Sequence, residues 1–175
     1  MTQHLHPSLQ NPSIASHTRI DSADQSYLNE EVDLNEVINS IIQTYLLQKQ
    51  NAPVIFRLDK IPVVNGCKET LHFLFDELIN MILSHPPDKS KLFLYMQCAE
   101  EKVDENVLDL RVMKTGNYVV CFHTNIHTTE EWKMLYKSKL EDCCQVAFQN
   151  GGSLNHYNIV NTGCLFSLTL PGKTI

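Results

Sequence analysis

The sequence lacks the features that direct a protein into a membrane or out of the cell. No apolar run among its 175 residues approaches the roughly 20 needed to span a bilayer. The start, MTQHLHPSLQ, has neither a positively charged segment nor an apolar core, so it does not form a secretory signal. The adjacent Cys143 and Cys144 would point in different directions on a helix, which argues against a redox pair. We therefore expect a cytoplasmic protein whose six cysteines are reduced and mostly buried.

Positive charge is scarce as well. The chain has 14 Lys and Arg against 20 Asp and Glu, a net charge of −6 and no basic run. Non-specific nucleic-acid binding depends on neutralising phosphates with Lys and Arg, so this composition disfavours it. A hydrophobic content of 43% and a charged content of 19% indicate one soluble domain with a substantial core.

The sequence divides into an arm and a domain. Residues 1–30 are rich in Ser, His, Asn, Gln and Pro, which is typical of a flexible arm, and we assign 31–175 to the domain. Apolar residues at helical spacing predict three helices within it, over 34–49, 68–85 and 129–149. The first has Asp33 as its N-cap, with Glu36 placed as in a capping box. Two prolines close the second helix, and NGG closes the third.

The strands fill the spaces between the helices. Alternating or continuous apolar residues predict extended segments over 54–58, 61–66, 91–101, 105–116, 117–125, 153–160 and 164–170. The last two are joined by a turn at 161–163. This order favours an α+β fold, a two-layer sandwich with three helices on one face of a mixed, mostly antiparallel sheet.

One family matches this order of elements. The run NGGSLNHYNIVNTGCLFSLTLPG places Gly151, Gly152, Gly163, Phe166 and the final Leu-Pro at the spacing of the catalytic ATP-binding domain of sensor histidine kinases. The segments VDLNEVI and VVNGCKETLHFLF resemble the starts of the first two helices of that domain. The chain therefore resembles this family over 32–173. The resemblance implies the family's fold, a place for Mg-ATP and partners in two-component signalling.

The metal-binding helix of the family corresponds to 68–85. Active members present there an acidic or amide residue and, one turn later, an asparagine whose oxygen is a hard ligand suited to Mg²⁺. Glu77 retains the first position, but Met81 stands at the second, and a thioether is a poor ligand for Mg²⁺. Ser84 replaces the family's lysine. We expect Met81 to fill space that the nucleotide occupies in active members.

The adenine and phosphate motifs have also changed. Where the family has Asp-x-Gly-x-Gly, the resemblance places His123, Asn125 and His127. A neutral histidine offers one acceptor nitrogen and lacks the strength of a carboxylate. Lys137 and Lys139 stand at the glycines that open the family's last helix, and the chain before them has no room for a lid over ATP.

These departures predict a domain without a cofactor that acts by contact. The expected role is that of an adaptor docking on a histidine kinase or a response regulator, and whether the chain pairs with itself stays open. Two alternatives remain. One is a divergent Mg-ATP-binding kinase acting in trans. The other is an ATP-independent phosphotransfer protein, whose phosphoaccepting residue could be any of His4, His6, His17, His72 or His85.

A zinc site was the other hypothesis for this region. Cys121, His123 and His127 have the donor groups that bind zinc. On a strand, 121 and 123 share a face, but 127 lies past a turn and no fourth ligand is evident. The pattern therefore favours no metal.

Overall fold

The computed structural model describes residues 30–49, 53–84, 91–100, 116–159 and 162–172. In chain order its elements are β1 (Glu30–Asp33), α1 (Leu34–Gln48), β2 (Val54–Leu58), β3 (Val63–Gly66), α2 (Lys68–Leu83), β4 (Leu92–Glu100), β5 (Asn117–Thr124), α3 (Glu130–Gln149), β6 (Ser153–Ile159) and β7 (Gly163–Pro171). All three predicted helices are present. Most of the strand predicted over 105–116 and nearly all of the predicted arm lie outside the described residues.

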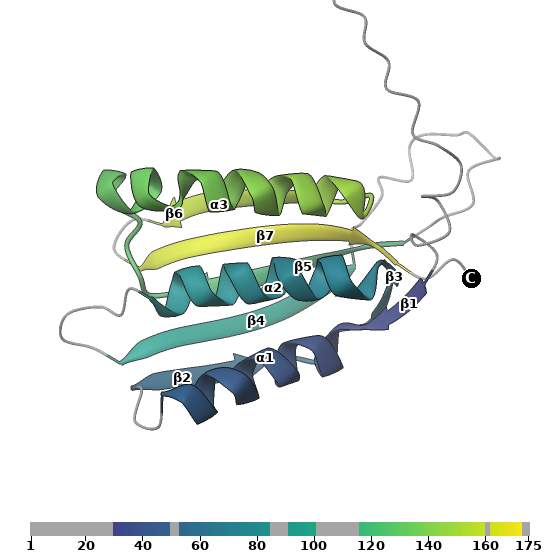
Figure 1. Ribbon diagram of the computed structural model, residues 1–175, viewed down its shortest axis with the longest axis horizontal. Coiled ribbons are helices and arrows are strands. Elements are labelled where there is room, and N and C mark those ends of the chain that lie inside the picture. Colours follow the sequence, from purple (N-terminus) through teal and green to yellow (C-terminus); the bar gives the residue numbers. More distant parts are fainter. Residues whose placement is uncertain (1–29, 50–52, 85–90, 101–115, 160–161, 173–175) are drawn as a thin grey trace, which may run out of the picture.

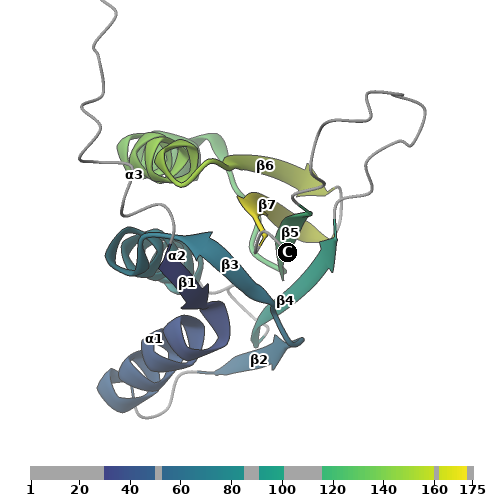
Figure 2. The same cartoon turned by 90° about the vertical axis from the view of Figure 1, so that its right-hand side faces the viewer.

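The five-stranded sheet has the order β2-β4-β5-β7-β6. Only β2 and β4 run parallel, while the other neighbours are antiparallel. The three helices lie side by side on one face, and no helix of the described residues covers the other, which we call the open face (Figures 1 and 2). The predicted α+β two-layer sandwich is therefore confirmed.

A second, small sheet consists of β1 and β3, paired antiparallel. An isolated bridge between Val64 and Gly172 links it to the end of β7. The strand β1 was not predicted, because its sequence EEVD has one apolar residue among acidic ones. Val32 is nevertheless 1% exposed, so β1 is held by this residue and by its pairing with β3.

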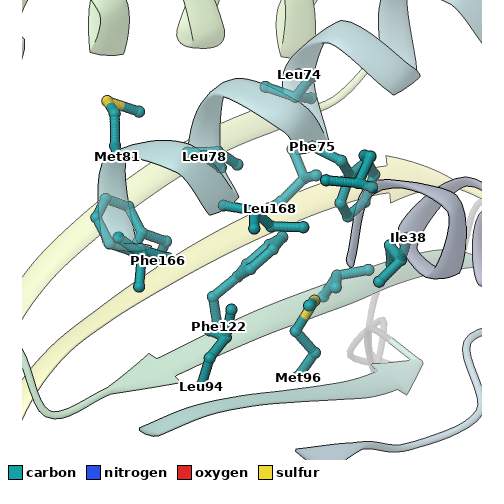
Figure 3. Packing of buried hydrophobic residues seen from close by; sticks show 14 of the residues in the cluster. Ile38, Leu74, Phe75, Leu78, Met81, Leu94, Met96, Phe122, Phe166 and Leu168 are labelled. Atoms are coloured by element: carbon teal, nitrogen blue, oxygen red, sulfur yellow. The ribbon is translucent and has the colours of Figure 1, made fainter. Parts of the chain in front are cut away.

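Side chains that point from the sheet toward the helices form the core. Leu94 and Met96 of β4, Phe122 of β5 and Phe166 of β7 are all fully buried, and the residues between them on each strand are more exposed. Phe75 of α2 packs on Phe122 with ring centroids 5.6 Å apart. Figure 3 shows α2 lying directly over this layer of side chains. The period-two alternation therefore fixes which residue of each strand faces the helices.

Local hydrogen bonds define the helix ends. The Asp33 carboxylate accepts from the side-chain amide of Asn35 at 2.7 Å and from its backbone N–H at 2.8 Å, and these two bonds lower the pKa of Asp33. The Thr129 hydroxyl accepts from the N–H of Trp132 at 3.1 Å, which selects Thr129 rather than Thr128 as the cap of α3. At the other end of α3, Gly151 has a φ of +73°, a left-handed conformation that suits glycine.

A buried amide joins the end of α3 to the start of α2. Asn150 is 2% exposed, and its Oδ1 accepts from the backbone N–H of Cys67 at 2.9 Å. Its Nδ2 lies 2.9 Å both from the Thr70 hydroxyl and from the Val146 carbonyl, and donates to them. The asparagine of NGG thus contributes more than a helix stop.

Candidate functional site

The seam between α2 and α3 contains an ion pair made by two of the predicted site residues. Glu77 of α2 and Lys139 of α3 approach to 2.7 Å between Oε2 and Nζ. The Glu77 side chain is 22% exposed and that of Lys139 is 50% exposed, so the pair sits at the edge of the helix layer. The pKa of Lys139 is raised, chiefly because its ammonium donates this hydrogen bond. The structure therefore brings together Glu77 and Lys139, two residues that the resemblance placed at the metal and phosphate motifs.

A buried thiol lies beneath this ion pair. Cys143 follows Lys139 by one turn of α3 and is fully buried. Its pKa is raised to about 12, first by burial and next by the negative charge of Glu77. The thiol is therefore protonated at neutral pH, which disfavours reactions that need the thiolate.

Replacing each of the two charged residues by alanine measures how much the ion pair contributes to the stability of the fold. Lys139→Ala and Glu77→Ala are each expected to lower the free energy of unfolding, and a double-mutant cycle should give a coupling of about 0.2 to 1 kcal/mol. The coupling is small because both side chains remain in contact with water. Urea unfolding of the four proteins measures it, and it should shrink in high salt. Additive single effects would show that the pair contributes nothing.

Met81, which the resemblance placed at the family's magnesium-binding asparagine, is 1% exposed. Figure 3 shows its side chain pointing away from the strands that carry Leu94 and Phe122. Ser84 caps the end of α2, where its hydroxyl donates to the Asn80 carbonyl at 2.7 Å. Met81 has no oxygen and Ser84 has no amide, so neither residue supplies the amide oxygen that the resemblance would place beside Glu77 as a ligand for Mg²⁺.

His123 lies on the open face of the sheet, away from the helices. Its ring stacks on Tyr95 with centroids 5.8 Å apart, and its Nε2 lies 2.8 Å from the Gln97 side-chain nitrogen. Because side chains alternate along β5, the last residue of that strand that faces the helices is Thr124, which is 5% exposed. His123, the predicted adenine position, therefore faces away from the helices, and its neighbour Thr124 faces them.

The loop 125–129 is all the chain between β5 and α3. Asn125 fastens it to β4, since its Oδ1 accepts from the N–H of Phe93 at 2.8 Å and its Nδ2 donates to the Lys91 carbonyl at 3.0 Å. His127 is exposed. The loop is short and α3 is helical throughout, so the described residues between β5 and β6 include no lid.

Buried residues after Thr124 were missed from the sequence. Thr128 is 5% exposed; its hydroxyl donates to the Asn158 side-chain oxygen and lies 3.1 Å from Nε2 of His156. Burial lowers the pKa of His156, with a further contribution from Lys133. These contacts fasten the loop to β6. The sequence did contain a signal for this burial. Ile126 is apolar and lies two residues from both Thr124 and Thr128, as in a segment whose alternate residues face the core.

An aromatic cluster fills the space under the first turns of α3. Trp132 is 3% exposed and packs on Tyr136, His156 and Phe166, with centroid distances of 4.8, 6.0 and 6.2 Å. Lys137 points outward, 3.9 Å from Glu141 on the same helix. The start of α3 is therefore packed against the sheet by large rings.

The described residues contain no group of three His, Cys, Asp or Glu side chains that could hold a metal ion. Cys121 and His123 do share the open face of β5, as expected from the strand. Burial raises the pKa of the Cys121 thiol, which disfavours the thiolate that zinc binds.

Solved structures resemble this fold, although no protein-family model and no curated protein matches the sequence. The mycobacterial sensor histidine kinase MprB is similar with a TM-score of 0.62 and 14% identity, over 84% of this chain and 99% of that chain. The catalytic domain of the histidine kinase ThkA is similar with a TM-score of 0.60 and 15% identity, over 81% of this chain and 94% of that chain. The ATP-binding domain of PrrB from Mycobacterium tuberculosis is similar with a TM-score of 0.58 and 15% identity, over 83% of this chain and 98% of that chain. The chain thus has the fold of histidine kinase catalytic domains. Each helix in the described residues is too short or too polar for a transmembrane span.

Proposed function

We propose that this chain is a histidine-kinase-type ATPase domain that no longer binds Mg-ATP and acts by contact, as an adaptor in two-component-type signalling. One observation carries the proposal, namely the ion pair between Glu77 and Lys139. A phosphate that approached Lys139, or a magnesium ion that approached Glu77, would meet a charge that is already paired with the opposite charge at 2.7 Å. The two helices that would hold the nucleotide are instead joined to each other.

The chemistry of the neighbouring positions supports the same conclusion. Met81 brings a buried thioether where magnesium needs an oxygen, and Thr124 brings a neutral hydroxyl where the exocyclic amine of adenine needs a carboxylate. The Thr124 hydroxyl lies 3.4 Å from the Ile126 N–H, from which it accepts. The residues present therefore do not fit Mg-ATP, and we derive no catalytic step through it.

The proposed partner follows from the fold. Its solved neighbours are histidine kinase domains and segments. An adaptor that keeps this fold retains an outer surface of the same general shape, so we infer a histidine kinase or a response regulator as its partner. Binding to either one would alter phosphotransfer without any chemistry in the adaptor itself.

Nucleotide binding is the direct test. We expect Mg-ATP and Mg-ADP at millimolar concentration to leave the melting temperature of the full chain unchanged. A nucleotide present at 100 times its Kd would stabilise the fold by about 2.7 kcal/mol. For a domain of this size that raises the melting temperature by about 5 to 10 °C, which differential scanning fluorimetry resolves easily.

An active histidine kinase catalytic domain measured in parallel provides the positive control. A magnesium-dependent shift of this chain would contradict the proposal and favour a kinase that acts in trans. In that case Glu77→Gln should abolish the shift, because it removes the charge next to the metal.

The phosphotransfer alternative predicts a different experimental result. Incubation with a phosphorylated receiver domain would leave acid-labile phosphate on a histidine of this chain. His72 is exposed on α2, whereas His4, His6, His17 and His85 lie outside the described residues. An adaptor is expected to remain unlabelled while it changes the rate of transfer between a kinase and its regulator. Labelling that a His-to-Gln substitution removes would overturn the adaptor proposal.

A further inference from the structure

The five-stranded sheet ends in two edge strands, β2 and β6. An edge strand exposes unpaired backbone groups, and soluble proteins usually protect it with charge, proline, bulges or short length. The strand β2 has several of these protections. It has five residues, it carries the charged Arg57, and Pro53 precedes it. The edge at β2 is therefore a poor template for another strand.

The edge at β6 has none of these protections. Its seven residues, SLNHYNI, include no Asp, Glu, Lys, Arg or proline. Its register with β7 runs through seven consecutive pairs, so no bulge twists it away. Tyr157 and Ile159 are 52% and 39% exposed on the open face of the sheet. The edge of the sheet beside α3 (Figure 2) is thus regular and uncharged, and no strand of the described residues pairs with it.

A shallow groove accompanies this edge on the helix side. It has a volume of about 550 Å³ and lies between α3 and His156 of β6. Its apolar lining includes Met134 and Leu140, and Met134 is 74% exposed. Its charged lining is two glutamates and two lysines, which pair as Glu130–Lys133 at 2.6 Å and Lys137–Glu141 at 3.9 Å. A strand added to β6 would therefore have apolar surface to cover.

We propose that β6 pairs antiparallel with β6 of a second copy of this chain, so that two sheets join into one across a two-fold axis. Such an interface uses the same patch on both subunits. The backbone hydrogen bonds of the two edges hold it together. The side chains of the groove cover it on one face.

The charge along this edge favours a second copy over other partners. The chain carries a net charge of −6, yet β6 is uncharged and the groove contains equal numbers of acidic and basic side chains. Two copies therefore meet here without repulsion. A strongly acidic or strongly basic partner would find no complementary net charge.

The sizes of the side chains are also self-complementary. The open face of β6 has two small side chains, Ser153 and Asn155, followed by two large ones, Tyr157 and Ile159. Antiparallel pairing centred on His156 places Tyr157 opposite the partner's Asn155 and Ile159 opposite the partner's Ser153. Each large side chain then packs beside a small one, which suits a cross-strand pair.

Solution mass measures this association. For the full chain in reducing buffer, sedimentation equilibrium from about 1 µM to about 1 mM should show the mass rising from 20.0 kDa toward twice that value. The double variant Asn155→Lys/Tyr157→Lys places lysine opposite lysine twice across the axis. We expect it to weaken dimerisation by about a hundredfold or more while the circular dichroism spectrum is unchanged, because both side chains are exposed.

The matched control adds the same charge elsewhere. Gln43→Lys/Ile55→Lys changes two exposed residues, on α1 and β2, away from β6 and should dimerise like the unmodified chain. A chain that stays monomeric over the whole range, or a β6 variant that dimerises as well as the control, overturns the proposal. Hydrogen exchange provides a second measurement. Amides of β6 that gain protection with concentration support it, whereas concentration-independent protection would place a segment of the same chain on this edge and refute it.

Discussion

Replacement of Gly163 by alanine should lower the free energy of unfolding by about 3 to 5 kcal/mol. Gly163 begins β7 with a φ of +130°, which residues with a side chain rarely adopt. A Cβ there would lie 1.9 Å from the Thr124 carbonyl oxygen and 2.7 Å from the Asn125 Cα. Both obstacles are backbone atoms, so no side-chain rotation relieves the clash, and the end of β5 would have to move away from the turn.

Gly151→Ala is the matched control. Gly151 also has a positive φ, of +73°, but its Cβ would meet only the Pro171 ring, at 3.5 Å. The strain of the left-handed conformation alone should cost about 1 to 2 kcal/mol. Urea unfolding of both variants separates the contributions of strain and collision. Equal losses would show that the contact of Gly163 with the loop after β5 is unimportant.

Met81→Asn is the second substitution with a large expected effect. It restores the residue that active kinases have at this position, and it is expected to cost about 3 to 5 kcal/mol without creating a nucleotide site. The loss has two sources. The variant loses the stabilisation that comes from burying the thioether, and it places a polar amide at a position that is only 1% exposed. Glu77 would remain paired with Lys139, so magnesium would still lack a free carboxylate.

Two further variants isolate these effects. Met81→Leu keeps the volume and should cost less than about 1.5 kcal/mol. Ser84→Lys introduces the family's lysine at an exposed position and should leave stability nearly unchanged. Thermal unfolding with and without Mg-ATP measures the stability and the nucleotide binding of all three variants, Met81→Asn, Met81→Leu and Ser84→Lys. A Met81→Asn protein that is as stable as the unmodified chain would show that Met81 does not fill the space between the helices.

The helices were predictable because their signals are local. Asp33 and Thr129 cap α1 and α3, and Gly151 follows the end of α3. Each signal acts within a few residues of the helix end, so the sequence contains all that is needed. The alternation in β4, β5 and β7 likewise identifies the residues that form the core.

The strand β1 depends on distant residues. Glu30 and Glu31 do not favour a strand, and they pair with Gly66 and Asn65. That pairing forms only when β3 is in place, more than 30 residues later in the chain. Local propensity therefore gave no signal for it.

The candidate site was predictable only in part. The change of residue type at Glu77, Met81 and Lys139 was visible in the sequence. The ion pair between Glu77 and Lys139 was not, because it depends on how α2 and α3 are set against each other, 62 residues apart in the chain. That His123 faces away from the helices was missed for a different reason. The family motif was aligned by spacing, and a shift of one residue moves a side chain to the other face of a sheet.

The amide of Asn150 has a consequence for how the domain loses its structure. Its three hydrogen bonds require the first turn of α2 and the last turn of α3 at the same time. If either helix end frayed alone, the buried Asn150 amide would lose hydrogen-bond partners without gaining water in their place. We therefore expect the two ends to open cooperatively. Two segments about 80 residues apart in the chain thus belong to one melting unit.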